Sequence, residues 1–323
     1  MTATRVIVEA WLSANRNLGI DSFMVRISKN TAKKLWLREI FRFKGSVIPG
    51  VLERSIFCGA FGILISFLYS RQLPVAQPIL GGVIPSIVLA LLLVFRTNTA
   101  YERFWEGRKL WGSTVNTIRN LAWEIWVAVD EVEPGDRERK ITALRLLPAF
   151  AISEKLSLRY EPASEELQPW ISPSQYRVLQ NIKNMPLEIT HWLGEYLQQE
   201  YKRGLLTNYQ LASIHTLMNK LMDNVGGCER ILKTPIPPAY VIHLNQLVLI
   251  YCLILPFQFV KDLGWWTGIL VALVSFALFG IEEIGVEIEN PFGYDHNDLP
   301  LDGICQNIQN NIEEFIASKT NQE

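Results

Sequence analysis

Four apolar runs alternate with long polar segments along the chain, which divides it into membrane-like and water-soluble parts. An apolar helix must be about 20 residues long to cross a bilayer, and runs of this kind predict membrane spans. We expect spans at 55–70, at 81–95, from Tyr240 to about Val260 and at 265–281. The remaining residues, and above all 96–238, are polar and charged, so the pattern predicts an integral membrane protein with a large helical part in water.

The second apolar run continues into a polar segment without a helix-breaking residue. The run leaves the membrane at Arg96, and the chain then has no proline until Pro134. One continuous helix is therefore expected to pass from lipid into water. Ile87, Leu91 and Phe95 recur at i, i+4 and i+8, so they share one face over about 12 Å of rise. Every other face of this run is apolar too, and spacing alone leaves packing and pore lining both open for the three residues.

The long polar region has the periodicity of amphipathic helices. An extension of the second helix is expected to end at the turn Pro134-Gly135, and a further helix at 137–159 is expected to break near Pro148. Ser172 begins a segment with a capped-helix pattern, and helical patterns return through 190–231. We find no alternating strand pattern, so the predicted fold class is all-α.

The flanks of the apolar runs predict the topology. The stretch from Arg26 to Arg54 contains eight basic and two acidic residues, whereas the short loop after Ser70 has one charged residue, Arg71. Basic flanks lie on the cytoplasmic side of membrane helices. We therefore expect a cytosolic N-terminal segment (1–54), two spans (55–95), a cytosolic helical region (96–238), two more spans (239–281) and a cytosolic C-terminal segment (282–323). No cleaved signal is expected.

Composition and motifs argue against several classes of function. The chain is 49% hydrophobic and 20% charged with a net charge of −1, and it lacks the basic run that nucleic-acid binding requires. The four cysteines form no CxxC pattern, and the four histidines have no metal-ligand spacing. Without a phosphate loop or a nucleophile motif, we predict no catalytic residues, no required cofactor and no enzyme.

Three motifs resemble segments of one protein family. The sequence FRTNTAYERFWEGRKLWG follows the second apolar run, CERILKTPIPPAY precedes the third, and NPFG with NDLPLD follows the fourth. Together they resemble, in the same order, the corresponding segments of the bestrophins, in particular their prokaryotic and plant relatives.

This resemblance implies a homopentameric ion channel with four spans per subunit and both termini in the cytosol, in a bacterial inner membrane or a plastid-type membrane. The family's hydrophobic pore neck falls on Ile87, Leu91 and Phe95. Arg96, Glu102 and Arg103 follow as candidates for the cytosolic vestibule. A second constriction is expected near Leu205 to Leu211.

The permeant ion and a metal are less well defined by the sequence. The resemblance favours small anions such as chloride and bicarbonate, while a sodium channel of the same fold and a membrane-tethered scaffold remain alternatives. In calcium-gated relatives an acidic cluster follows NPFG, and Asp295 and Asp298 match two of its positions. Calcium prefers six to eight oxygen ligands, and Tyr294, His296 and Asn297 dilute the acidic run, so calcium is a possible ligand only.

Overall fold

Helices make up most of the chain that the structure describes. The structure is a computed structural model that describes residues 43, 45–77 and 83–320, and those residues contain no strand. The α-helices are α3 (Ile48–Ser70), α4 (Val83–Ala128), α5 (Asp136–Leu158), α6 (Pro173–Leu179), α7 (Met185–Lys202), α8 (Asn208–Lys233), α9 (Pro238–Leu263), α10 (Thr267–Glu287) and α11 (Leu301–Thr320). Two 3₁₀ turns, η2 (Glu165–Leu167) and η3 (Gly264–Trp266), complete the list. The predicted all-α class is confirmed.

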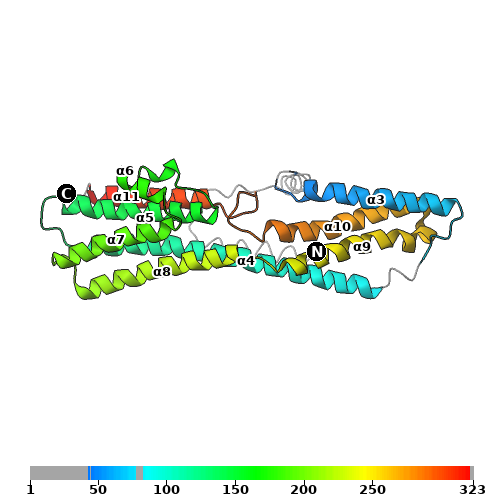
Figure 1. Cartoon of the computed structure of the whole chain (residues 1–323), viewed down its shortest axis with the longest axis horizontal. Coiled ribbons are helices and arrows are strands. Elements are labelled where there is room, and N and C mark those ends of the chain that lie inside the picture. Colours follow the sequence, from blue (N-terminus) through cyan, green and yellow to red (C-terminus); the bar gives the residue numbers. More distant parts are fainter. Residues whose placement is uncertain (1–42, 44, 78–82, 321–323) are drawn as a thin grey trace, which may run out of the picture. The chain divides into compact units, whose positions relative to one another are not determined.

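Helix α4 connects the two halves of the fold. It is 46 residues long, about 69 Å at 1.5 Å per residue, and it continues past Arg96 as predicted. Figure 1 shows α9 and α10 beside its first part and α5, α7 and α8 along the rest. Its direct contacts agree, since α4 packs on α9 and α10 and also on α8, α5 and α11. The same helix therefore belongs to a membrane-like bundle and to a water-soluble bundle.

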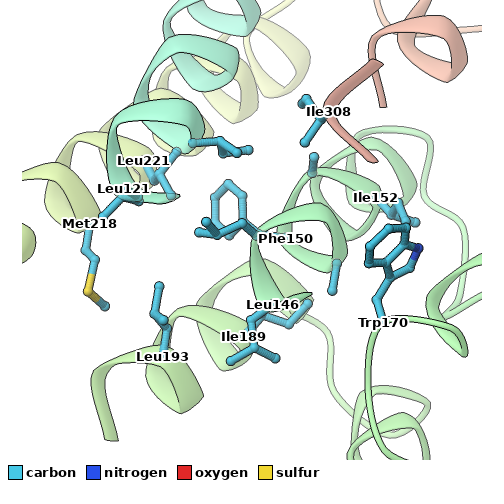
Figure 2. Packing of buried hydrophobic residues seen from close by; sticks show 14 of the residues in the cluster. Leu121, Leu146, Phe150, Ile152, Trp170, Ile189, Leu193, Met218, Leu221 and Ile308 are labelled. Carbon is cyan, nitrogen blue, oxygen red and sulfur yellow. The ribbon is translucent and has the colours of Figure 1, made fainter. Parts of the chain in front are cut away.

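Each bundle has its own apolar core. In the membrane-like bundle Leu89 and Leu93 of α4 pack with residues of α3, α9 and α10, including Val51, Val248 and Val271. The core of the water-soluble bundle begins on α4 at Trp111 and draws on α5, α7, α8 and α11. Figure 2 shows part of this core, where Phe150 of α5 lies among leucines of neighbouring helices.

Small residues allow α3 and α10 to approach each other closely. An added Cβ at Gly59 would lie 2.8 Å from the Ala272 Cβ, and one at Gly62 would lie 2.9 Å from the Gly268 Cα. Close backbone contact through glycine is the usual way in which helices associate in lipid, where apolar surface gains little from burial. This contact explains why the first apolar run contains two glycines.

The largest difference between helix bounds and predicted spans is at the start of the first span. Helix α3 begins at Ile48, seven residues before the predicted start at Ser55. Pro49 lies in its first turn, where proline is favoured because the first backbone N–H groups of a helix have no partner within it. The stretch Pro238–Glu287 has the length and apolar character of membrane-crossing helix, as do Ile48–Ser70 and Ile84–Ala128. Gly264, with φ +53°, divides that stretch into α9 and α10. The basic flank, apart from Arg54, and the start of the predicted second span at Gly81 lie outside the described residues.

The predicted break at Pro148 is wrong. Helix α5 runs through this residue without interruption, and Pro148 itself is buried. A proline inside a helix removes one hydrogen bond and costs about 3 kcal/mol. Nearly every residue from Ala143 to Leu158 is buried against other helices, and this packing outweighs the proline penalty. Sequence periodicity could not show how completely α5 is surrounded.

A carboxylic acid lies in the centre of the water-soluble bundle. The Glu154 side chain of α5 is fully buried, and no nitrogen or hydroxyl group of the described residues donates to its carboxyl oxygens. Burial raises the pKa of Glu154 to about 8, and the thiol of Cys228 on α8 lies beside it. The group is therefore protonated at neutral pH, because an ionised carboxylate would be poorly solvated there.

The pH dependence of stability should reveal this acid. The folded protein keeps the Glu154 proton up to about pH 8, whereas the unfolded chain releases it near pH 4.5. The folded state thus binds more protons between these values, so stability falls as pH rises through this window, by roughly 1 kcal/mol per pH unit. We expect Glu154→Gln to remove this slope in thermal unfolding at pH 5 to 8. A slope that persists in the variant would place its origin in another group.

Candidate functional site

The three predicted neck residues lie on a face of α4 that the other described residues leave largely exposed. Ile87, Leu91 and Phe95 are 61%, 52% and 54% exposed. Leu89 and Leu93, which point away from this face, are only 5% and 2% exposed. Large apolar side chains on one long open face mark a surface that lipid, another subunit or a pore must cover. The structure thus places the three residues together and leaves them free of the subunit core.

The same face becomes polar beyond the apolar run. Asn98, Glu102, Trp105 and Lys109 follow Phe95 at steps of three or four residues, and all four are exposed. These steps keep the residues on one side of an α-helix. A face that changes from apolar to charged along a single helix fits the wall of a water-filled pathway better than a lipid contact along its whole length. We call Ile87, Leu91, Phe95, Asn98 and Glu102 the open stripe of α4.

Arg96 lies inside the subunit and not on the open stripe. Its side chain is 1% exposed, and its Nη2 donates to the Glu289 Oε2 at 2.6 Å. Gly285 of α10 lies beside it, where an added Cβ would be at an ordinary contact distance of 3.5 Å from the Arg96 Cγ. This placement favours a packing and pairing role over direct contact with a permeant ion. Of the three vestibule candidates, Glu102 is the one that the structure leaves fully exposed.

Arg103 joins α4 to two other segments of the chain. Its Nε donates to the Glu289 carbonyl oxygen at 3.1 Å, its Nη2 donates to the Ile231 carbonyl oxygen at 2.6 Å, and its Nη1 donates to the carbonyl oxygen of Thr234. The last two carbonyls belong to the end of α8, where a cation is favoured by the helix dipole and by unpaired carbonyl groups. The guanidinium therefore holds three polypeptide segments together.

Glu289 completes this junction. While one carboxyl oxygen accepts from Arg96, the other accepts from the Ile236 backbone N–H at 3.0 Å. The three sequence motifs thus meet at one place, because Arg96 and Arg103 belong to the first, Ile236 to the second and Glu289 immediately precedes NPFG. Sequence reasoning missed Glu289. The signal for it was an acidic residue two positions before Pro291, just past the end of α10.

The segment proposed for a second constriction lies at the far end of α4. Leu205, Leu206 and Leu211 are 8%, 4% and 7% exposed, so they are buried in the isolated subunit. The Leu205 carbonyl oxygen accepts from the Asp130 backbone N–H at 2.9 Å, just after α4 ends. This contact ties the segment to the same helix that carries the neck residues, and the constriction itself stays a prediction.

The acidic loop after NPFG brings few carboxylates together. The Asp298 Oδ2 accepts from the Asp295 backbone N–H at 2.8 Å, as in a capped turn, while the Asp295 side chain points to the exposed surface. Burial raises the pKa of Asp298 to about 6. No group of three or more acidic, histidine or cysteine side chains in the described part of the chain is placed to hold a metal. These residues do not fit calcium within one subunit, and the calcium site stays a prediction.

A side-chain cation occupies the centre of this loop. Arg159 donates from Nε to the Phe292 carbonyl oxygen and from Nη2 to the Gly293 carbonyl oxygen, each at 3.1 Å. Its Nη1 lies 3.1 Å from the Asp302 Oδ2, and its guanidinium stacks 3.9 Å from the centre of the Tyr294 ring. Lys155 adds a second cation, 2.8 Å from the Asp302 Oδ1. The chain itself thus neutralises Asp302 and fixes the loop.

Removing this guanidinium should loosen the loop. We expect Arg159→Ala to destabilise the protein by about 3 kcal/mol, because it leaves two carbonyl groups without their donor and takes from Asp302 one of its two cationic partners. Arg159→Lys should recover only part of this loss, since an ammonium cannot reach all three acceptors. Thermal unfolding measures the loss, and hydrogen exchange at 291–299 locates it. Arg177→Ala is the matched control, as Arg177 bonds only within its own helix α6. Equal effects of Arg159→Ala and Arg177→Ala would contradict the assignment.

Comparison with known proteins gives the family. A sequence profile described as Bacterial/Fungal Bestrophin protein matches residues 27–314. The chain belongs to the bestrophin family. This bestrophin is 59% identical over 290 residues to a Nostoc protein named voltage-dependent anion channel-forming protein, which covers 90% of this chain and 94% of the relative. A Synechocystis protein with the same descriptive name is 52% identical over 283 residues, covering 88% and 92%.

Solved structures agree with the fold of this bestrophin. A bacterial bestrophin homologue from Klebsiella pneumoniae matches with a TM-score of 0.74 and 27% identity, over 84% of this chain and 98% of the other. The resemblance on three motifs is therefore confirmed at the level of the family. The family and the names of these relatives point to a channel rather than to an enzyme.

Proposed function

We propose that this bestrophin is a subunit of a homopentameric channel that conducts chloride and other small anions through a neck formed by Ile87, Leu91 and Phe95. The observation that carries the proposal is the open stripe of α4, which is apolar for the length of the neck and polar beyond it. The names of the Nostoc and Synechocystis relatives support an anion as the permeant ion. Five copies of α4 around an axis would cover the stripe and give its polar part access to water.

We further propose four membrane spans per subunit: α3, the first part of α4, α9 and α10. Helices α3, α9 and α10 have 23, 26 and 21 residues, and each length suffices to cross the hydrocarbon region. An even number of spans puts the two ends of the chain on the same side of the membrane. The basic flank of the first span makes that side the cytosol, in a bacterial inner membrane or a plastid-type membrane.

The proposed neck would gate by excluding water. Transferring a small ion into an apolar environment is very unfavourable, so a narrow ring of Ile87, Leu91 and Phe95 would be dewetted and closed. A wider ring would hold hydrated ions and conduct. An apolar ring distinguishes poorly between anions and cations, and Glu102 would place negative charge next to it. The preference for anions must therefore come from other groups along the pathway.

Purified protein in planar bilayers tests the proposal. Under a tenfold gradient of sodium chloride, an anion channel gives a reversal potential close to the chloride equilibrium value, about 58 mV in magnitude at 25 °C for a tenfold gradient. A potential of the opposite sign would make sodium the permeant ion and overturn the anion assignment. Absence of current, together with absence of chloride flux in liposomes, would favour a membrane-tethered scaffold. Native mass spectrometry in mild detergent tests the number of subunits.

A further inference from the structure

A cavity lies between three membrane-like helices, at the end that adjoins the water-soluble bundle. Its volume is about 530 Å³, and α3, α9 and α10 form its walls. One part of the lining is charged or polar and consists of Glu53, Arg54, Asn245 and Glu282. The other part is apolar and consists of Phe57, Leu249 and Phe279. The open stripe of α4 contributes none of these residues, so the cavity is separate from the proposed pore.

The charged part of the lining contains both signs. Glu282 is 3% exposed, and its Oε2 lies 3.5 Å from the Arg54 Nη1. Arg54 is shared with Glu283, 3.3 Å away, and its side chain is still 49% exposed. An acidic side chain within an apolar helix is costly to place in a membrane, and such residues mark functional sites. The guanidinium of Arg54 and the carboxylates of Glu53 and Glu282 thus face the cavity, where an incoming polar group can reach them.

These features match a lipid headgroup and one acyl chain. The cavity offers polar groups at one place and aromatic and aliphatic walls at another, as an amphiphile requires. Its position at one end of three membrane helices places it near the headgroup level of a leaflet. An anionic headgroup is disfavoured because Glu53 and Glu282 outnumber Arg54. The lining is complementary to a headgroup that carries both a phosphate and a cation with N–H groups. The phosphate can accept from Arg54, and the cation can donate to the carboxylates.

We propose that this cavity binds one zwitterionic phospholipid with a primary ammonium group per subunit. The ammonium group donates to the carboxylates of Glu53 and Glu282, and the phosphate accepts from Arg54. The acyl chain lies along Phe57 and Leu249. The proposal requires that the protein spans a membrane and does not depend on which ion it conducts.

Native mass spectrometry of the delipidated protein in mild detergent tests the lipid class. We expect phosphatidylethanolamine to bind once per subunit, about tenfold more tightly than phosphatidylcholine, whose ammonium has no N–H donor. Phosphatidylglycerol, which is anionic, should also bind more weakly. Equal binding of all three lipids, or preference for phosphatidylglycerol or for a neutral galactolipid, would overturn the proposal.

Two pairs of variants test the location. Glu282→Gln should lower the affinity for phosphatidylethanolamine about tenfold, because it removes one hydrogen bond to a charged group. Glu283→Gln is its matched control, because Glu283 also pairs with Arg54 but does not line the cavity. Leu249→Trp should fill the apolar part and remove bound lipid, whereas Ile250→Trp, at the next and exposed position, should not. Lipid binding that survives both Glu282→Gln and Leu249→Trp would place the lipid elsewhere.

Discussion

Replacing Ile87, Leu91 and Phe95 together by alanine is expected to raise the channel conductance several-fold and to make closed states rare. The substitution widens the proposed ring and removes apolar surface that favours dewetting. The three side chains are more than half exposed, so their truncation creates no cavity in the subunit core and should leave folding intact. Single-channel recording in planar bilayers measures both the conductance and the closed times. Ion preference, read from the reversal potential, should change much less.

The chain offers a control with the same residue types. Ile269, Leu273 and Phe276 share one face of α10 at i, i+4 and i+7, and they are 51%, 64% and 36% exposed. Replacing these three by alanine removes the same kinds of side chain from another membrane-like helix. We expect this control to conduct as the unmodified protein does. If the α4 triple variant also leaves conductance unchanged, the neck lies elsewhere.

Replacing Arg103 by alanine should cause the second large effect, a loss of stability of about 4 kcal/mol. The guanidinium donates to the carbonyl groups of Ile231, Thr234 and Glu289, and its removal leaves three acceptors, two of them partly buried, without this donor. Arg103→Lys should be nearly as harmful, because one ammonium cannot replace a fork that reaches three carbonyls. The yield of assembled protein from size-exclusion chromatography and the midpoint of thermal unfolding measure the effect.

Arg119→Ala is the matched control for this prediction. Arg119 lies on the same helix, is exposed, and has no side-chain hydrogen bond among those of the described residues. A surface substitution of this kind usually changes stability by less than about 0.5 kcal/mol. If Arg103→Ala assembles and unfolds like Arg119→Ala, the junction does not depend on Arg103.

The membrane-like helices and the family could be predicted from the sequence, whereas the junction could not. Apolar runs and the absence of proline after Arg96 depend on neighbouring residues, so a linear pattern reports them. The pairing of Arg96 with Glu289 joins residues that are 193 positions apart. No periodicity links such positions, and only the folded chain shows that Arg96 forms an ion pair inside the subunit.

Glu154 and Pro148 show the same limit within a single helix. Both would be expected at an exposed site or at a helix end, because a carboxylate is hard to bury and a proline breaks a helix. Both lie in the buried middle of α5. The number of helices that surround α5 decides this outcome, and that number is a property of the tertiary fold. The three neck residues show the converse case, since their shared face was predictable and their exposure was not.

The continuity of α4 also restricts how the gene can change. Each residue turns an α-helix by about 100°, so one codon inserted after Phe95 would rotate everything that follows relative to Ile87 and Leu91. Arg103 would then leave its carbonyl partners, and Trp111 would turn out of its core. A loop absorbs such a change locally, but an uninterrupted helix transmits it to its end. Insertions and deletions should therefore be eliminated by selection throughout α4.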